Sequence, residues 1–228
     1  MEEKEILGEG YGFTLDPNLV LYLPLYQLDG SKFISQDAYG HECTATGTVW
    51  RFNGRYFDGV DDKINCGSAA SLNPTTGLTI LAWLNPTSFS AEHRHIMSRD
   101  ANPLRVFRFI VAGATGLLNF AFSPFAAEDG LQATTTCTAG AWQLVGVTYK
   151  WITDGTSEIR LYLNDSEIKN KTTAGGPIPE ATTNNLIGLT AGNAEDFLGA
   201  FGEVWMYNTP LSTIEIVHIY NSTKWRYV

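Results

Sequence analysis

Turn-forming residue pairs recur along most of this chain, and they limit what it can fold into. Gly, Pro, Asn and Asp provide the backbone angles that tight turns need. Many short segments between such turns favour a β-sandwich over a fold of alternating strands and helices. The turn signals are Asp29-Gly30, Asn53-Gly54, Asp58-Gly59, Asn73-Pro74, Asn85-Pro86, Asp129-Gly130, Asp154-Gly155 and Gly175-Gly176-Pro177.

The segments between the turns alternate in polarity with a period of two and are rich in β-branched and aromatic residues, as in half-buried strands. The clearest predicted strands are Leu78–Leu84, Val106–Val111, Trp142–Tyr149 and Glu158–Leu163. Asn164-Asp165 is a predicted hairpin turn, because Asn and Asp tolerate left-handed backbone angles. We therefore predict an all-β fold, a two-sheet antiparallel β-sandwich (jelly roll) of about twelve to fourteen strands.

The C-terminal part adds one more strand and the single short helix that we predict. Val204 and Met206 share one face of this strand, and Trp205 lies on the other. After a proline turn, Ser212 is followed three residues later by Glu215. This spacing is typical of a capping box, in which each residue satisfies a free backbone N–H of the other, so a helix is expected to begin there.

The chain of 228 residues is predicted to form one domain. Residues 1–17, rich in Glu and Gly, are expected to be a flexible N-terminal arm. Residues 18–228 are expected to form a single domain, since no linker or internal repeat divides them. With 44% hydrophobic residues, a chain of this length buries roughly 70% of its unfolded surface.

Charge and hydropathy exclude two classes of partner. Against 24 acidic residues there are 15 basic ones, which are scattered, so nucleic acid is not expected to bind. The longest apolar run, Leu19–Leu25, is too short to span a bilayer, so no membrane insertion is predicted. The N-terminus shows no apolar segment typical of a secretory signal, and the cellular location stays open.

The three cysteines, Cys43, Cys66 and Cys137, lie in unrelated contexts without metal-ligand spacing. We expect small buried thiols, and a disulfide between Cys43 and Cys66 is left open.

Four segments resemble, in order, motifs of laminin-G-like and pentraxin-like jelly rolls, which belong to the concanavalin A-like lectin/glucanase superfamily. The resemblance runs from about Leu19 to Tyr220 and implies the fold rather than the chemistry. The segments are Tyr56–Ile64 (YFDGVDDKI), Leu78–Leu84 (LTILAWL), Trp142–Tyr149 (WQLVGVTY) and Tyr162–Asp165 (YLND).

Enzymes of this superfamily provide one function to weigh. Glycoside hydrolysis needs two carboxyl groups flanking the scissile bond. The strand that corresponds to the catalytic one carries Arg105, Phe107 and Phe109 instead. A polysaccharide lyase would need Tyr, His and Arg in one groove, for which His93, Arg94, His95 and Arg99 are available. Such residues on a loop and a strand are usually solvated, which is the interpretation that we favour, and we predict no enzyme.

Calcium is the one cofactor that the sequence suggests, since loops rich in Asp, Asn and Gly supply its oxygen ligands. The first candidate cluster is Asp58 and Asp61, in a loop that also holds Asp62, with Asp37 from an earlier loop. The resemblance to pentraxins implies a second cluster, in which Asp100 and Asn102 meet a later acidic loop. That loop holds Asn193, Glu195 and Asp196. Ordinary turn formation by Asp and Asn is the alternative for both clusters.

Aromatic side chains are candidates for sugar binding, because a flat ring stacks on the apolar face of a pyranose. Trp83 and Trp142 match core positions of the family and are expected inside. Trp205 and Trp151, together with Tyr149 and Phe125, are the candidates for exposed aromatic residues. The alternative, more common for such residues, is that they cover a convex face or pack under a loop. The candidate ligand-binding set is Trp151, Trp205, Tyr149 and Arg105.

The sequence thus predicts a non-catalytic recognition or adhesion module, lectin-like and calcium-assisted, whose partner is a glycan or a protein surface. The alternative is a structural or surface-decoration subunit of a phage, a virus or another large assembly, in which the chain forms a homo-oligomer. A divergent polysaccharide lyase or glycoside hydrolase is the third interpretation. The fold resemblance suggests an extracellular or virion-surface location.

Overall fold

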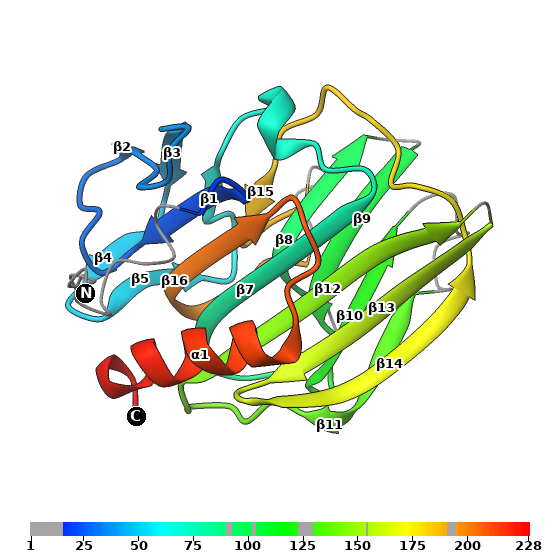
Figure 1. Ribbon diagram of the computed structural model, residues 1–228. Helices are drawn as coiled ribbons and strands as arrows, with labels where there is room; N and C mark the ends of the chain where they lie inside the picture. The colour runs from blue at the N-terminus through cyan, green and yellow to red at the C-terminus, as the bar shows by residue number, and fades with distance from the viewer. Residues whose placement is uncertain (1–15, 90–92, 102–103, 123–129, 154, 191–194) are drawn as a thin grey trace, which may run out of the picture.

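The computed structural model describes residues 16–89, 93–101, 104–122, 130–153, 155–190 and 195–228. Two antiparallel sheets lie face to face, and one helix crosses the outer surface of the first sheet (Figure 1). The fold is therefore the predicted all-β sandwich with one C-terminal helix. Of the arm predicted for residues 1–17, the residues before Asp16 lie outside the described part of the chain.

The first sheet, sheet A, holds eight strands, and β1 (Leu19–Pro24) pairs with β16 beside the main path. In order across the sheet, the other seven are β14 (Ser166–Ala174), β13 (Thr156–Leu163), β12 (Gln143–Thr153), β7 (Gly77–Pro86), β16 (Leu198–Tyr207), β5 (Gly54–Asp58) and β4 (Val49–Arg51).

The second sheet, sheet B, also holds eight strands. In order they are β11 (Leu131–Thr136), β10 (Leu117–Phe122), β9 (Leu104–Val111), β8 (Arg94–Ala101), β15 (Leu186–Ile187), β6 (Lys63–Asn65), β3 (Glu42–Thr46) and β2 (Lys32–Ile34). The described residues thus contain sixteen strands, slightly more than predicted, because short strands such as β2 and β15 carry too few residues to show alternation.

The four strands singled out in the sequence are confirmed as parts of β7, β9, β12 and β13. The hairpin turn at Asn164-Asp165 joins β13 to β14, and Asn164 has the left-handed backbone angle expected there, with φ at 56°. Its side-chain oxygen also accepts a hydrogen bond from the Leu144 N–H at 3.1 Å. The turn is therefore tied to the neighbouring strand as well as to its own hairpin.

The inner faces of the two sheets enclose a common core. Ile80, Val147 and Val204 of sheet A are fully buried in it, as predicted. One row of core residues crosses sheet B, each lying opposite the next: Ala45, Ile64, Ile187, Met97, Phe109, Phe120 and Leu131. Because each fully buried large aliphatic or aromatic side chain stabilises the fold by roughly 1.5–3 kcal/mol, this shared core holds the sheets together.

A second apolar cluster lies on the outer face of sheet A, beneath α1 (Thr213–Thr223) and the turn η3 (Lys224–Arg226). Ile216 and Ile219 of α1 pack against Trp83 and Trp205 of the sheet. The helix begins with the predicted capping box, in which the Ser212 hydroxyl accepts from the Glu215 N–H. A short helix of this length relies on that cap and on packing for its stability.

Trp205, one of the candidates for an exposed aromatic residue, is buried. Trp205 does alternate with Val204 and Met206, but the helix covers the face to which it points. Its ring is fully buried and stacks on Tyr22, with 5.6 Å between the ring centroids. Trp83 is buried in the same outer cluster, and Trp142 packs partly buried against it.

Two further predictions can be compared with the described residues: the state of the three cysteines and the lack of a membrane-spanning segment. Cys43, Cys66 and Cys137 are buried free thiols, as expected, and the disulfide left open between Cys43 and Cys66 is not formed. Within the described part of the chain, no helix has the length and apolarity that crossing a bilayer requires.

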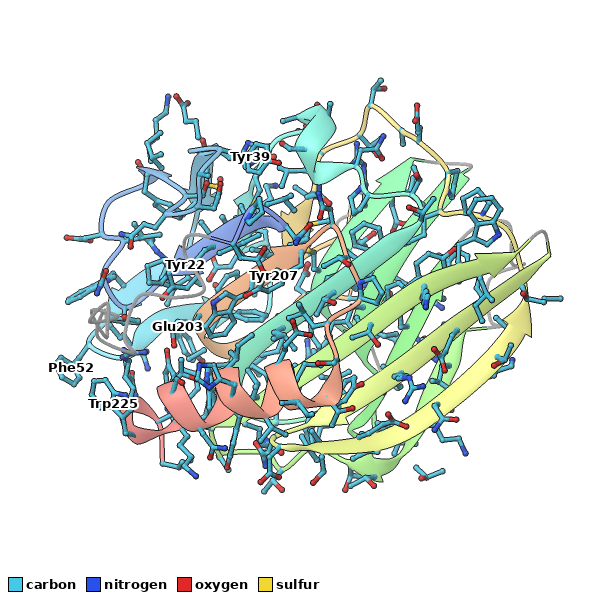
Figure 2. The ribbon with its side chains drawn as sticks, viewed as in Figure 1. Tyr22, Tyr39, Phe52, Glu203, Tyr207 and Trp225 are labelled. Carbon is cyan, nitrogen blue, oxygen red and sulfur yellow. The ribbon has the colours of Figure 1, made fainter. Side chains whose placement is uncertain are left out.

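The C-terminal tail is fastened to sheet A through Glu203, a nearly fully buried carboxylate. It pairs with Arg226 at 2.8 Å and accepts hydrogen bonds from the Tyr22 and Tyr227 hydroxyls at 2.9 and 3.1 Å (Figure 2). Gly202 leaves room for this arrangement, since a Cβ there would lie 2.4 Å from the Tyr227 ring. Burial raises the pKa of Glu203, although Arg226 and the two tyrosines oppose the rise.

This raised pKa predicts how the free energy of unfolding depends on pH. Folded Glu203 keeps its proton to a higher pH than unfolded Glu203, whose pKa is ordinary for Glu. Its contribution is therefore complete below the unfolded pKa and is lost as pH rises through the folded pKa. Urea unfolding of the wild type and of Glu203→Gln would be measured from pH 4 to 8. As pH rises from the unfolded to the folded pKa of Glu203, the free energy of unfolding of the wild type should fall relative to that of the variant, and at higher pH the difference should become constant. A difference independent of pH would contradict the assignment.

Candidate functional site

The outer face of sheet B carries the residues that alternate with the core row. Thr44, Asn65, Leu186, Ser98 and Arg108 lie opposite one another in turn across β3, β6, β15, β8 and β9. Since successive side chains on a strand point to opposite faces, this row points away from the core. The helix packs on sheet A, so the outer faces of the two sheets differ in what covers them.

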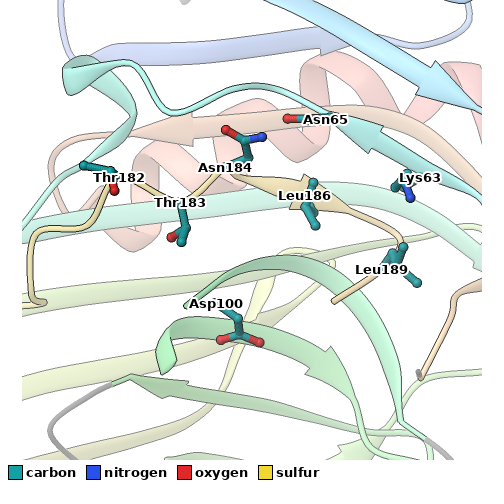
Figure 3. A pocket seen from close by; sticks show the side chains of 8 residues that line it. All are labelled: Lys63, Asn65, Asp100, Thr182, Thr183, Asn184, Leu186 and Leu189. Atoms are coloured by element: carbon teal, nitrogen blue, oxygen red, sulfur yellow. The ribbon is translucent and has the colours of Figure 1, made fainter. Parts of the chain in front are cut away.

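A pocket of about 420 Å³ lies on this outer face (Figure 3). Its floor includes Asn65 of β6 and Leu186 of β15, and one wall is the loop of residues 182–184. In Figure 3, Thr182 and Thr183 lie on one side, Lys63 and Leu189 on the other, and Asp100 below. The full lining is Lys63, Asn65, Asp100, Thr182, Thr183, Asn184, Leu186 and Leu189.

Two oxygen atoms of this lining lack partners. One carboxylate oxygen of Asp100, Oδ2, accepts a hydrogen bond from the Thr190 hydroxyl at 2.8 Å. Its other oxygen, Oδ1, is buried and has no hydrogen-bond partner among the described residues, and the same holds for the Thr183 Oγ1. An unpaired buried polar group costs about 1–3 kcal/mol, so a ligand that bonds to both atoms recovers that free energy.

Of the predicted site residues, Asp100 lines the pocket, and the strand register sets Arg105 opposite it on β9. The side chain of Arg105 lies outside the described residues, as do Asn102 and Phe125 entirely. The other lining residues were missed. Alternation with Ile64 could have put Lys63 and Asn65 on the outer face, but only the strand order of sheet B brings them near Asp100.

The described members of the second predicted calcium cluster do not lie together. Asp196 and Glu195 lie at the start of β8, where the Arg94 guanidinium donates to the Asp196 carbonyl oxygen at 2.5 Å. There Glu195 contacts the buried His95 at 2.9 Å, and this hydrogen bond lowers the pKa of Glu195. Asp100 ends the same strand, about 16 Å further along at 3.3 Å per residue. Asn193 lies outside the described residues.

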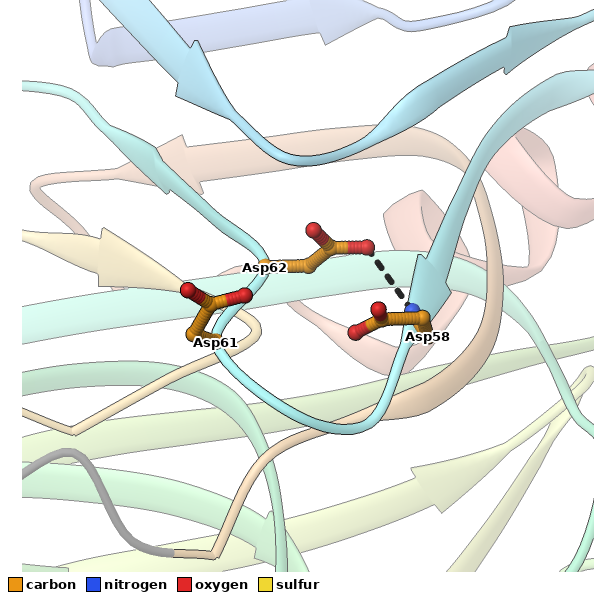
Figure 4. A group of neighbouring side chains, drawn as sticks. All are labelled: Asp58, Asp61 and Asp62. Atoms are coloured by element: carbon orange, nitrogen blue, oxygen red, sulfur yellow. Dashed lines mark hydrogen bonds between the residues drawn. The ribbon is translucent and has the colours of Figure 1, made fainter.

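The first predicted cluster does assemble in part. Asp58, Asp61 and Asp62 bring carboxylate oxygens within 4.8 Å of one another in the loop after β5 (Figure 4). Asp62 is buried and accepts a hydrogen bond from the Asp58 N–H at 2.8 Å. Burial raises the pKa of Asp62, while this hydrogen bond opposes the rise. Asp37 is not a member, because its carboxylate accepts from backbone N–H groups of Tyr22, Tyr39 and Gly40.

Neither of the two candidate aromatic residues on β12, Tyr149 and Trp151, is an exposed ring on which a sugar could stack. The candidate Tyr149 is not exposed, since it shares the inward face with Val147 and is fully buried. Its hydroxyl donates to the Gly176 carbonyl at 2.7 Å. Trp151 shares this face and packs half-buried at the edge of the core.

The exposed aromatic rings lie instead at the end of the molecule formed by the β4–β5 hairpin and the C-terminus. Trp50, Phe52 and Trp225 are 40%, 90% and 69% exposed, and Figure 2 shows the last two at the same end. The Trp50 N–H donates to the Tyr26 carbonyl, and the Arg226 guanidinium lies over the rings of Tyr26 and Trp225. These five residues are termed the aromatic patch.

The residues available for a lyase point in different directions. Arg99 is buried toward the core side and donates to the backbone carbonyls of Leu72 and Ala181. His93 accepts from the Gly113 N–H, and His95 is occupied by Glu195. Each therefore has a structural role, and the four do not converge on one groove.

Comparison with known families agrees with this architecture. The sequence model described as the concanavalin A-like lectin/glucanases superfamily matches residues 58–217, more than half of the chain. The chain belongs to this superfamily. Because its description covers both lectins and glucanases, the site residues rather than the membership bear on function. A search of curated proteins found no match.

Solved structures with this superfamily fold include three that cover most of the chain. A Trypanosoma rangeli sialidase mutant displaying trans-sialidase activity aligns with a TM-score of 0.70 and 15% identity over 92% of this chain and 34% of its own. The binding domain of Paraclostridial Mosquitocidal Protein 1 aligns at 0.64 and 15% over 90% and 52%. Domain 4 of AbnA, an extracellular arabinanase from Geobacillus stearothermophilus, in complex with arabinotriose, aligns at 0.63 and 16% over 88% and 97%.

The chain thus spans about a third of the sialidase and nearly all of the arabinanase domain. At these identities the likeness shows the fold alone.

Calcium at Asp58, Asp61 and Asp62 stays a prediction that a melting curve can check. An ion in hundredfold excess over its dissociation constant stabilises the folded state by about 2.7 kcal/mol, or roughly 5–10 °C for a domain of this size. The shift should vanish in Asp61→Asn, because this substitution removes one carboxylate of the cluster. Asp61 is exposed and takes no part in the hydrogen bond between Asp58 and Asp62, so the variant should still fold. Asp165→Asn, in the exposed β13–β14 turn, should keep the shift. If calcium leaves the melting curve of the wild type unchanged, the prediction that this loop binds calcium is wrong.

Proposed function

We propose that this protein is a non-catalytic carbohydrate-binding module whose sugar site is the pocket on the outer face of sheet B. The observation that carries the proposal is the pair of buried oxygens, Asp100 Oδ1 and Thr183 Oγ1, left without partners in its lining. A saccharide offers many hydroxyl groups, each both donor and acceptor, in a small volume. Pockets of this size that combine a few polar groups with apolar walls are typical of small-ligand sites.

The chemistry of the lining suits a sugar ring. Asp100 can accept from ligand hydroxyls, whereas the amides of Asn65 and Asn184 can both donate and accept. Leu186 and Leu189 supply the apolar contact for ring C–H groups. The arabinanase domain solved in complex with arabinotriose supports the proposal, since it shows that a domain of the same fold can hold an oligosaccharide.

A role without catalysis is supported by the carboxylates. Glycosidases use two, roughly 5–10 Å apart, one as acid and the other as base or nucleophile. Among the described residues that line the pocket, Asp100 is the single carboxylate. On β9, Phe107 and Phe109 point into the core. The proposed module therefore binds a sugar and leaves its glycosidic bonds intact.

Substitutions in the pocket test this proposal. Asp100→Asn should weaken glycan binding roughly tenfold or more, because a hydrogen bond to a charged group is worth about 1.5–3 kcal/mol. Thr183→Val should weaken it by about fivefold. Affinities for ligands found on a glycan array would be measured by calorimetry, with Asp165→Asn as the control outside the pocket. Wild-type protein that binds no glycan at high micromolar concentration would defeat the proposal.

The aromatic patch favours a second function, that of a subunit in a larger homo-oligomeric assembly such as a virus particle. A contiguous exposed aromatic surface is uncommon on a monomer and typical of interfaces, where aromatic residues and Arg are enriched. Trp225 and Phe52 are its most exposed members. We infer that the patch meets a second copy of this chain.

Self-association can be measured directly. Size-exclusion chromatography with light scattering should show a mass that rises with protein concentration. The double variant Phe52→Ser, Trp225→Ser should remain monomeric because its apolar contact area is lost. The matched control is Ile214→Ser, which removes an exposed apolar side chain from α1, away from the patch. A wild-type protein that stays monomeric at every concentration would exclude this function.

A further inference from the structure

We propose that the pocket on sheet B selects saccharides that carry an anionic group, and that Lys63 binds this group. The inference rests on the proposed function, since it names the class of sugar that the same pocket takes. Lys63 is the one cationic side chain among the described residues that line the pocket. Its position follows from strand alternation, because the neighbouring Ile64 points into the core.

Lys63 has no partner of opposite charge: among the described residues, no carboxylate lies within 4.0 Å of its ammonium group, whereas Lys32 pairs with Glu42. Other strand cations, such as Lys169 and Lys171, also lack such a partner, but they are exposed and do not line the pocket. Lys63 is also half-buried, so part of its hydration is already lost.

A half-buried cation without a counter-ion favours a ligand that supplies one. A neutral sugar in the pocket would remove more water from the ammonium group without replacing the charge interaction, which is costly. A carboxylate or sulfate on the sugar would form a charge-assisted hydrogen bond instead. The polar lining thus discriminates between two sugars that differ by one charge.

Asp100 further limits the class of saccharides that the pocket can bind. It lies in the same pocket and keeps one oxygen free to accept from ligand hydroxyls. Its negative charge disfavours a free inorganic anion or a densely charged polyanion, since like charges repel across a short distance. The ligand that satisfies both ends has hydroxyl donors at one side and a single anionic group at the other. A uronic acid residue is of this class.

The test is a paired panel of oligosaccharides: uronate and sialylated oligomers, their neutral methyl esters, a sulfated oligomer, and neutral arabinotriose. Wild-type protein should bind an acidic member at least tenfold more tightly than its ester, and added salt should reduce that difference. The sulfated arm distinguishes sulfate from carboxylate as the source of the charge. Calorimetry would give the affinities.

Variants of Lys63 test whether this side chain causes the preference for acidic saccharides. Lys63→Met should lower affinity for the acidic member about tenfold and leave the ester unchanged, whereas Lys63→Arg should largely retain the preference. The matched control is Lys171→Met on the exposed face of β14, and melting curves confirm that each variant folds. Equal binding of acid and ester, or a preference that survives Lys63→Met, would overturn the inference while leaving the proposed function intact. Failure to bind any member, acidic or neutral, would overturn both.

Discussion

The common apolar core between the two sheets is the constraint on which the rest of this structure depends. Residues of both sheets alternate between this core and the outside, so every inward side chain determines the direction of its neighbours. Ile64 in the core places Lys63 and Asn65 outside, and Phe109 in the core places Arg108 outside. A shift of one residue in either strand would bury charges and expose the core, which keeps the register fixed.

The outer faces of the two sheets differ in the residues and elements that lie on them. On sheet A, α1 and the C-terminal turn cover an apolar cluster, and the buried Glu203 fastens the tail through Arg226 and two tyrosine hydroxyls. On sheet B, the outer face carries polar residues and a pocket. Asp100 and Lys63, on strands that are distant in sequence, provide opposite charges within that pocket. The helix thus covers part of the outer face of sheet A, whereas no helix among the described residues covers that of sheet B.

Local pattern predicted the strands well and the surface poorly. The Asn164 turn and the Ser212 capping box were predicted correctly, since both depend on residues a few positions apart. Trp205 was placed on the correct face of its strand, but alternation alone could not show that the helix, which comes later in the chain, covers that face. Tyr149 shares the parity of Val147, so alternation alone was enough to predict its burial.

Alternation, turn chemistry and helix capping are short-range effects, and from them the amino-acid sequence alone determined the all-β class, the principal strands and the resemblance to the superfamily. The pocket is a long-range product. Asp100 joins Asn65 only because β15 pairs with both β8 and β6, whereas Asp196 lies near the opposite end of β8 from Asp100. Strand order is set by the burial of the whole core at once, so only the tertiary structure decided which polar residues face one another.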